Sequence, residues 1–182
     1  MSDELLLRRA RKGDRAAVDR LLRDHYDIIR AVCRRIVANP ADADDAVQNA
    51  LIAIVRALPS FDGRSKFSTW VFRIATNAAL DEVRRIRRRP VPHDHEMLSP
   101  SPAAERTGAV DAQIDVRAAL EKLPEEYRVA MVLRHVADLD YAEIAVILDV
   151  PVGTVRSRLA RGRDQLGAIF GGGNEPSGGS VT

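Results

Sequence analysis

Arginines gather near the middle of the chain, where Arg84, Arg85, Arg87, Arg88 and Arg89 occupy five of six consecutive positions. Like charges this close repel one another, so the cluster calls for a counter-charge. Most arginine runs are no more than solvated faces. The density of this run favours phosphates, and we expect nucleic acid to supply the counter-charge.

A helix must position these arginines, because apolar residues recur before them at three- and four-residue steps. They are Phe67, Trp70, Val71, Ile74 and Ala78. A polar loop, residues 61–66, precedes the helix, Ser65 or Ser68 is the expected N-cap, and Pro90 ends the helix. One half of this helix is therefore expected to pack on a core and the other half to meet phosphates.

A helix-turn-helix is predicted near the C-terminus, from residues 141–148, the break Asp149–Val150 and a helix after Pro151. At about 100° per residue, Val152 and Leu159 share a buried stripe with Val155. Arg156 and Arg158 flank that stripe and suit phosphates. The opposite face suits a major groove and carries Thr154, Ser157, Ala160 and Arg161.

The segment 42–58 predicts a second helix of interest, with acids at its positive end. Exposed polar and apolar residues beside its core positions indicate a surface for a partner protein, although a well-capped core helix explains them equally well. The acids could be mistaken for a metal cluster, but on one helix we expect them to diverge. The residues are Asp42, Asp44, Asp45, Gln48, Asn49 and Ile52.

Composition favours an all-α chain. Of the 182 residues, 46% are hydrophobic, 30% charged and only 4% aromatic, while the net charge is +2 and the pI about 9.0. The only cysteine, Cys33, lies in an apolar helical pattern, and a buried, inert thiol is expected. The histidines lack zinc-ligand spacing, so neither a metal nor a cofactor is predicted. Without a signal-peptide pattern or a long apolar run, a cytoplasmic protein is expected.

The pattern predicts two small helical domains. The first, residues 1–90, contains a helix near the N-terminus, a helix from Asp14 that ends before Asn39–Pro40, and the two helices above. Prolines among polar residues over 91–110 indicate a flexible linker. Residues 111–170 form the second domain, and the glycine-rich tail 171–182 is expected to be disordered.

Three blocks of sequence make the chain resemble a bacterial extracytoplasmic-function (group IV) RNA polymerase sigma factor. They are DADDAVQNAL, ALPSFDGRSKFSTWVFRIATNAALDEVRR and YAEIAVILDVPVGTVRSRLARGRDQL, in that order. The resemblance implies that the first domain is sigma region 2, which opens and reads the −10 element. It implies that the second is sigma region 4, which reads the −35 element.

The same resemblance assigns roles to residues. A flipped −10 base and the adjacent backbone would be held by Phe61, Asp62, Gly63, Arg64, Ser65, Lys66, Asn77, Arg84 and Arg85. The −35 element would be contacted by Arg156, Ser157, Arg161 and Arg163, and the helix-face argument above adds Thr154 and Arg158. The acidic helix would bind the polymerase β′ clamp through Asp42, Asp44, Asp45, Gln48 and Asn49, to which the exposed-face argument adds Ile52, and region 4 would bind the β flap.

Some positions depart from the family pattern. Asn49 stands where an acid is usual and Leu51 where Phe is frequent, which implies altered polymerase affinity. Ala160 replaces a larger side chain, and Gly162 is expected to weaken the helix by about 1 kcal/mol relative to Ala. The family also implies an anti-sigma factor as a partner.

Two other classes of protein could contain parts of this sequence. A stand-alone helix-turn-helix regulator would bind duplex DNA without polymerase, but it has no need of the segment 61–89. An enzyme is disfavoured, because the sequence has no paired carboxylates facing a pocket, no Ser/His/Asp set, no phosphate-binding loop and no metal spacing.

Overall fold

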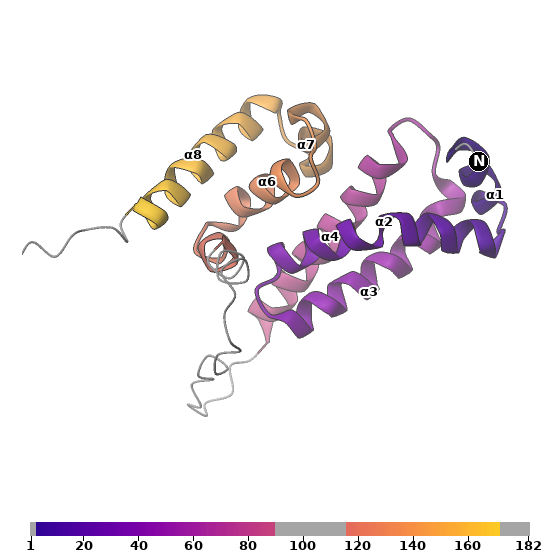
Figure 1. Cartoon of the computed structure of the whole chain (residues 1–182), viewed down its shortest axis with the longest axis horizontal. Helices are drawn as coiled ribbons and strands as arrows, with labels where there is room; N and C mark the ends of the chain where they lie inside the picture. The colour runs from indigo at the N-terminus through magenta and orange to yellow at the C-terminus, as the bar shows by residue number, and fades with distance from the viewer. Residues whose placement is uncertain (1–2, 90–115, 172–182) are drawn as a thin grey trace, which may run out of the picture.

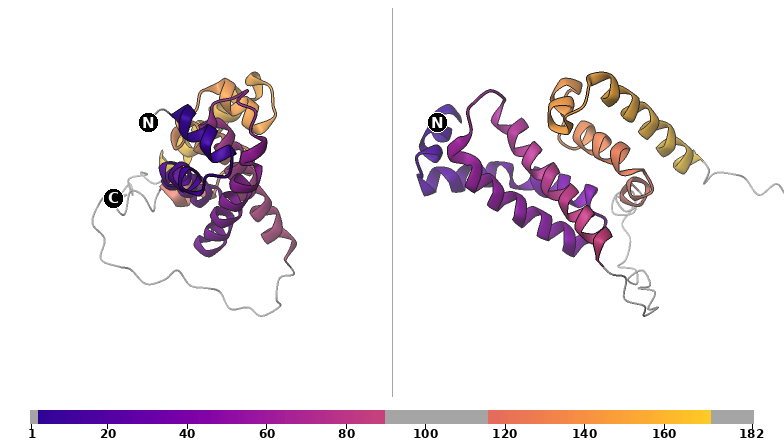
Figure 2. Two further views of the ribbon diagram at one scale, coloured as in Figure 1. Left: turned by 90° about the vertical axis from the view of Figure 1, so that its right-hand side faces the viewer. Right: turned by 180° about the vertical axis from the view of Figure 1, so that it is seen from behind.

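The computed structural model describes residues 3–89 and 116–171, and all regular elements within these ranges are helices. Two bundles lie side by side (Figures 1 and 2). The all-α class is confirmed, whereas the expected linker 91–110 and residues 172–182 of the expected tail lie outside the described ranges. Within those ranges, no helix has the length and apolar character needed to cross a membrane.

The first bundle contains four α-helices and one short 3-10 helix. The elements are α1 (Asp3–Arg11), α2 (Arg15–Ile36), α3 (Pro40–Ala57), η1 (Leu58–Ser60) and α4 (Phe67–Arg88). The second bundle contains helical residues 116–121 and three labelled helices. These are α6 (Glu125–His135), α7 (Tyr141–Leu148) and α8 (Val152–Gly171).

Side-chain caps set the helix starts in the first bundle. The Asp14 carboxylate accepts hydrogen bonds from the amides of residues 16 and 17, at 3.1 and 3.2 Å. Asn39 caps α3 in the same way, with Pro40 at the first helical position, where its missing N–H costs nothing. Asn39–Pro40 therefore begins a helix, and α2 has already ended at Ile36.

α2, α3 and α4 pack on one another around fully buried aliphatic side chains, among them Ile29, Ile54 and Val71. Cys33 is also fully buried there, and its Sγ lies 3.8 Å from the carbonyl oxygen of Ala75. The expectation of a buried thiol is confirmed.

The second bundle holds the predicted helix-turn-helix. α7 opens with a capping box, in which the Asp140 side chain accepts from the Glu143 amide and the Glu143 side chain accepts from the Asp140 amide. Asp149 ends α7 in the left-handed conformation, with φ of 53°. Such a residue reverses the chain direction over a short distance, so α8 can start at Val152.

Gly162 does not disturb α8, which continues to Gly171. It is buried, and a Cβ placed on it would lie 2.9 Å from Cγ of Met131 on α6. The expectation that this glycine only weakens the helix is wrong, because its missing side chain lets α8 approach α6 closely.

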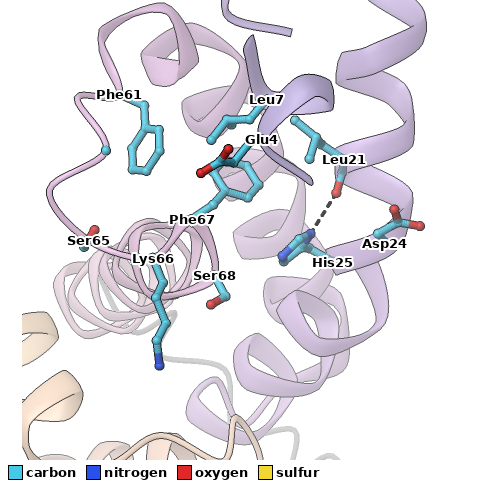
Figure 3. Close-up of a pocket in the computed structure, with 11 residues that line it drawn as sticks. Glu4, Leu7, Leu21, Asp24, His25, Phe61, Ser65, Lys66, Phe67 and Ser68 are labelled. Atoms are coloured by element: carbon cyan, nitrogen blue, oxygen red, sulfur yellow. Dashed lines mark hydrogen bonds between the residues drawn. The ribbon is translucent and has the colours of Figure 1, made fainter. Parts of the chain in front are cut away.

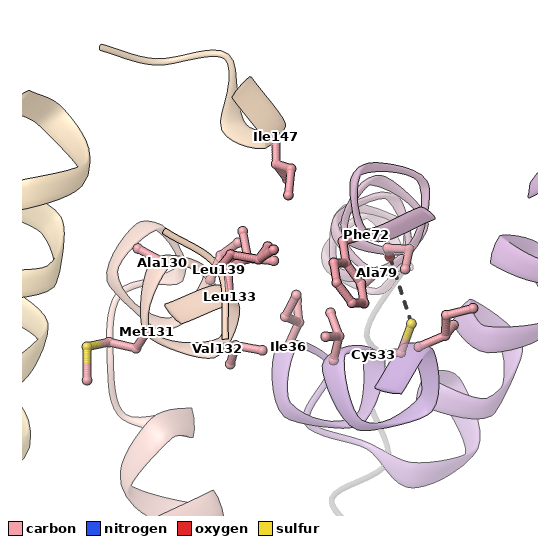
Figure 4. Packing of buried hydrophobic residues seen from close by; sticks show 14 of the residues in the cluster. Cys33, Ile36, Phe72, Ala79, Ala130, Met131, Val132, Leu133, Leu139 and Ile147 are labelled. Carbon is pink, nitrogen blue, oxygen red and sulfur yellow. Dashed lines mark hydrogen bonds between the residues drawn. The ribbon is translucent and has the colours of Figure 1, made fainter. Parts of the chain in front are cut away.

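The two bundles share one hydrophobic core. α2 packs against α6 and α4 against α7. Ile36 and Phe72 of the first bundle belong to the same buried cluster as Leu133 and Ile147 of the second, and Figure 4 shows these side chains facing each other. In this arrangement the bundles contact each other directly, so their positions do not depend on the connection alone.

Candidate nucleic-acid and polymerase interfaces

The loop 61–66 forms a tight polar turn at the start of α4. The Asp62 carboxylate accepts a hydrogen bond from the Arg64 amide at 3.0 Å, and Gly63 has φ of 78°, which a glycine adopts without strain. The N-cap of α4 is Lys66, and its side chain makes no capping hydrogen bond. The expectation of a Ser65 or Ser68 cap is therefore wrong.

A pocket of about 530 Å³ opens beside this loop (Figure 3). Aromatic rings support it, since Phe61 packs against Phe67 and Trp70 with ring centroids 5.6 and 5.1 Å apart. Phe61 is only 3% exposed, so it acts as a wall of the pocket and does not stand free. The lining comes from α1, α2, the loop and α4: Glu4, Leu7, Leu21, Asp24, His25, Phe61, Gly63, Ser65, Lys66, Phe67 and Ser68.

Asn77 lies elsewhere. It is exposed on α4 and lines a second groove, of about 470 Å³, between α3 and α4. Asn49 and Arg85 line the same groove. The structure therefore brings Asn77 together with Asn49, a residue assigned to polymerase binding, and not with the loop 61–66.

The arginines at the end of α4 find partners within the protein. Arg84 pairs with Asp81 at 2.9 Å, Arg85 with Glu82 at 2.8 Å and Arg87 with Glu125 of the second bundle at 3.0 Å. The Glu82 carboxylate raises the pKa of Arg85 above its ordinary value, with smaller contributions that include Asp45. The expectation that the counter-charge comes from nucleic acid is thus incomplete, because the chain's own acids already supply much of it.

Glu82 is 3% exposed and lies between acids of α3 and arginines at the end of α4. Carboxylate oxygens of Asp42, Asp45 and Glu82 lie within 4.8 Å of one another. The expectation that the α3 acids diverge is therefore wrong for Asp42 and Asp45. Arg89 pairs with Asp42 at 3.0 Å and Arg85 with Asp45 at 3.1 Å, so guanidinium groups offset the negative charge of this cluster.

The outward face of α3 is partly apolar. Ile52 is 49% exposed, Val55 is also exposed, and Gln48 and Asn49 lie beside them on the surface. Asp44 on the same helix is bound by the Arg34 guanidinium. The opposite face is buried in the core, so α3 is both a core helix and an exposed surface, and the two interpretations left open by the sequence do not exclude each other.

α8 presents the predicted reading face to solvent. Val155 and Leu159 are fully buried, while Arg156, Ser157, Arg161 and Arg163 are exposed and Thr154 is half-buried. Arg158 differs, since its side chain is 22% exposed and pairs with Glu126 of α6 at 3.3 Å. Val152 is 37% exposed, contrary to expectation, because the first turn of α8 borders an open groove with Val146 and Val150.

Two residues beside the loop 61–66 were missed by the sequence analysis. Glu143 of α7 accepts hydrogen bonds from Lys66 at 3.0 Å and from Thr69 at 3.2 Å. The hydrogen bond from Lys66 holds the pKa of Glu143 below its ordinary value. His25 of α2 lines the loop pocket. The sequence signals the Asp140–Glu143 capping box, but it contains no sign of either contact with the loop region.

Comparison with known proteins agrees with this geometry. The family model for Sigma-70 region 2 matches residues 21–89, and that for Sigma-70, region 4 matches residues 113–166. These matches coincide with the bundle that carries the loop pocket and with the bundle that carries the helix-turn-helix.

Curated relatives extend the similarity over most of the chain. It is 37% identical to the ECF RNA polymerase sigma factor SigM of Mycobacterium tuberculosis, over 93% of this chain and 85% of the relative. It is 37% identical to the ECF RNA polymerase sigma-E factor of Escherichia coli K12, over 91% of this chain and 93% of that one.

Solved structures share the fold of both bundles. CnrH in complex with the cytosolic domain of CnrY matches with a TM-score of 0.72 and 26% identity, over 93% of this chain and 97% of that chain. RpoE of Bartonella quintana, solved in complex with the anti-sigma factor NepR, matches with a TM-score of 0.72 and 25% identity, over 84% and 96%. With both family models matched and curated relatives 37% identical over most of its length, the chain belongs to the extracytoplasmic-function family of RNA polymerase sigma factors.

Proposed function

We propose that this chain binds core RNA polymerase and directs it to a narrow set of promoters through separate −10 and −35 contacts, while the polymerase alone performs the chemistry. One observation carries the proposal. A single chain has an exposed helix-turn-helix face on one bundle and, on the other, a pocket beside a polar loop. A stand-alone regulator of duplex DNA would need only the first of these.

The loop 61–66 and its pocket would take one extruded base of the −10 element. Extruding a base costs a few kcal/mol of stacking and pairing, and a stacking site returns roughly 1–3 kcal/mol per base. The pocket of about 530 Å³ has the apolar walls and polar groups that suit a base. Asn77 would contact another nucleotide, because it lines a different groove.

Arg84 and Arg85 would bind phosphates of the DNA strand, and their guanidinium groups would then release the carboxylates that they contact in the free chain. Arg84 pairs with exposed Asp81, and Arg85 pairs with both Glu82 and Asp45. Because Asp45 also belongs to the proposed clamp-binding set, polymerase binding at α3 would free part of the Arg85 guanidinium for DNA.

The exposed face of α3 would bind the β′ clamp, with Ile52 and Val55 as the apolar contacts and the acids as polar ones. The apolar groove of the second bundle, which Val146 and Val152 border, would receive the β flap. A similar structure contains a sigma factor with its anti-sigma factor, and we propose that such a partner also covers these faces.

Run-off transcription with purified core polymerase tests this function. Promoters are first found by mapping transcription starts after overexpression, and one of them serves as template. We expect a transcript that core polymerase alone does not make. Tight, specific binding to duplex DNA together with no transcript would instead favour a stand-alone regulator.

A further inference from the structure

We propose that His25 and Glu4, which lie outside the loop 61–66, form a wall of hydrogen-bond acceptors that selects an extruded base carrying an exocyclic amino group. The inference rests on the proposed −10 function of the loop pocket. It adds to that function the chemical class of base that the pocket takes. Both residues line the pocket, Glu4 from α1 and His25 from α2.

The hydrogen bond of His25 determines which ring nitrogen accepts. Nδ1 lies 2.9 Å from the carbonyl oxygen of Leu21, and a carbonyl can only accept, so Nδ1 carries the proton. A neutral imidazole has one N–H, and Nε2 is therefore an acceptor. In Figure 3 this second nitrogen is turned toward the side of Ser68.

Packing holds the ring in this orientation. The His25 ring meets Phe67 edge-on, with centroids 5.2 Å apart and planes at 88°. The hydrogen bond to Leu21 fixes the other edge. An acceptor held at two points loses little freedom when a base arrives, which is the condition for selectivity.

The two other charged side chains that line the pocket, Lys66 and Asp24, are paired with other residues, so His25 and Glu4 set its hydrogen-bonding character. Lys66 is turned toward the second bundle, where its Nζ pairs with Glu143 at 3.0 Å (Figure 3). Asp24 is engaged by Arg20 at 3.0 Å. The Glu4 carboxylate lies between Leu7 and Phe67 in Figure 3. The hydroxyls of the two lining serines can donate or accept, and so they do not select.

An acceptor wall separates the bases by their exocyclic groups. Adenine and cytosine each present an amino group as donor, whereas thymine presents carbonyl oxygens at the corresponding positions. Glu4 is exposed and His25 half-buried in the free chain, so a base in the pocket would cover acceptors that water can reach. A carbonyl facing Nε2 or a carboxylate would then leave the covered acceptors without a donor, which costs more than a missing contact. The pocket should therefore take an amino-bearing base and reject thymine.

The test uses the complete chain in holoenzyme and templates with synthetic non-template strands. At each −10 position an adenine is replaced by purine, a cytosine by 2-pyrimidinone or a guanine by hypoxanthine, so that only the amino group is lost. For the wild-type chain we expect one position at which the replacement lowers run-off transcription roughly 5- to 10-fold, the range of one hydrogen bond.

Variants then assign the effect. His25→Phe keeps a ring against Phe67 and removes the acceptor, and Glu4→Met removes the carboxylate oxygens from an exposed position of α1 while keeping a side chain of similar length. Both should reduce the difference between natural and analogue templates at that position alone. Tyr26→Ala is the matched control, because Tyr26 is an exposed neighbour on α2 that does not line the pocket.

Full discrimination by both His25→Phe and Glu4→Met would overturn the inference, and so would a wild-type chain that transcribes equally well from every analogue template. In either case the proposed function would stand. The absence of any promoter-specific transcript from the wild-type holoenzyme would instead remove the proposed function, and the inference with it.

Discussion

Lys66 and Glu143 form an ion pair across the two bundles, with Nζ 3.0 Å from Oε1, although 77 positions separate them in the sequence. One residue belongs to the proposed −10 loop and the other to the first helix of the proposed −35 reader. Elements centred at −10 and −35 are about 25 base pairs apart, or roughly 85 Å of duplex at 3.4 Å per pair. On the proposed function, we therefore expect this ion pair in the free chain and expect it to break when both elements are bound.

Glu143→Gln should loosen this contact without unfolding α7. Gln can still accept from the Asp140 amide in the capping box, while the charge that binds Lys66 is gone. We expect a larger radius of gyration at low salt and roughly 2- to 5-fold tighter binding of single-stranded −10 DNA, because Lys66 is released. Asp164→Asn, an exposed change on α8, is the control. Unchanged scattering and unchanged DNA affinity would contradict the expectation.

Acid should open the same contact. Hydrogen bonding from Lys66 lowers the pKa of Glu143 from its ordinary value of 4.5. A group whose pKa is depressed by folding stabilises the folded arrangement above its unfolded pKa and loses this contribution as the pH falls through the folded value. Energy transfer between dyes on the two bundles should therefore stay constant near neutral pH and fall only at acidic pH, below the ordinary pKa of 4.5. Glu143→Gln should lose this pH dependence.

Gly162→Ala should destabilise the chain even though alanine is the better helix former. The added Cβ would meet Met131 at 2.9 Å in a buried contact, and overpacking of this kind costs about 1–3 kcal/mol against a gain of about 1 kcal/mol in helix propensity. Gly167 on the same helix has open space around it, so Gly167→Ala should instead raise the melting temperature. Thermal unfolding of both variants measures the difference, and equal shifts would mean that α8 does not pack closely on α6.

Substitution of Arg161 by alanine should impair transcription, whereas substitution of Arg158 should mainly impair stability. Arg161 is exposed on the reading face, and its substitution by alanine should abolish −35-dependent transcription while polymerase binding persists. Arg158 pairs with Glu126 and is mostly covered, so its loss should mainly lower stability. Run-off assays, pull-down of core polymerase and thermal melts separate the two effects. Loss of polymerase binding in Arg161→Ala would mean that this side chain packs and does not read DNA.

Cys33 should be inert in the folded chain. Burial raises the pKa of its thiol to about 12, so the reactive thiolate is absent at pH 8. A colourimetric thiol reagent should react with the chain only after denaturant is added. Rapid labelling of the native chain would show that the core around α2 opens readily. Because the unfolded thiol ionises at lower pH than the folded one, stability should also decline above about pH 9.

The local pattern of the sequence was sufficient to predict most helices and the helix-turn-helix. Apolar periodicity predicted α4 and the buried stripe of α8 through Val155 and Leu159, because a helix repeats its faces every three to four residues. The break at Asp149–Val150 followed from the short spacing between two helical patterns, whereas the left-handed conformation of Asp149 is seen only in the structure. Ser65 and Ser68 failed as caps because capping depends on where the chain turns, and the turn is set by packing of Phe61 and Phe67.

The pairing of charges lay beyond such patterns. Asp42, Asp45 and Glu82 stand on two helices, and only the packing of α3 on α4 brings their oxygens together beside two arginines. The role of Gly162 was mispredicted for the same reason. Its missing side chain makes room for Met131 of α6, and only the packing of α8 on α6 shows that contact.

By itself, the sequence determined the helical class and the buried positions Val155 and Leu159 of α8, because apolar residues repeat at the spacing of a helix. The tertiary structure alone decided that Lys66 meets Glu143, that Asn77 lies apart from the loop pocket, and that His25 lines it. Each of these relationships joins residues from different helices, and a contact of that kind depends on how the helices pack rather than on the pattern within either one.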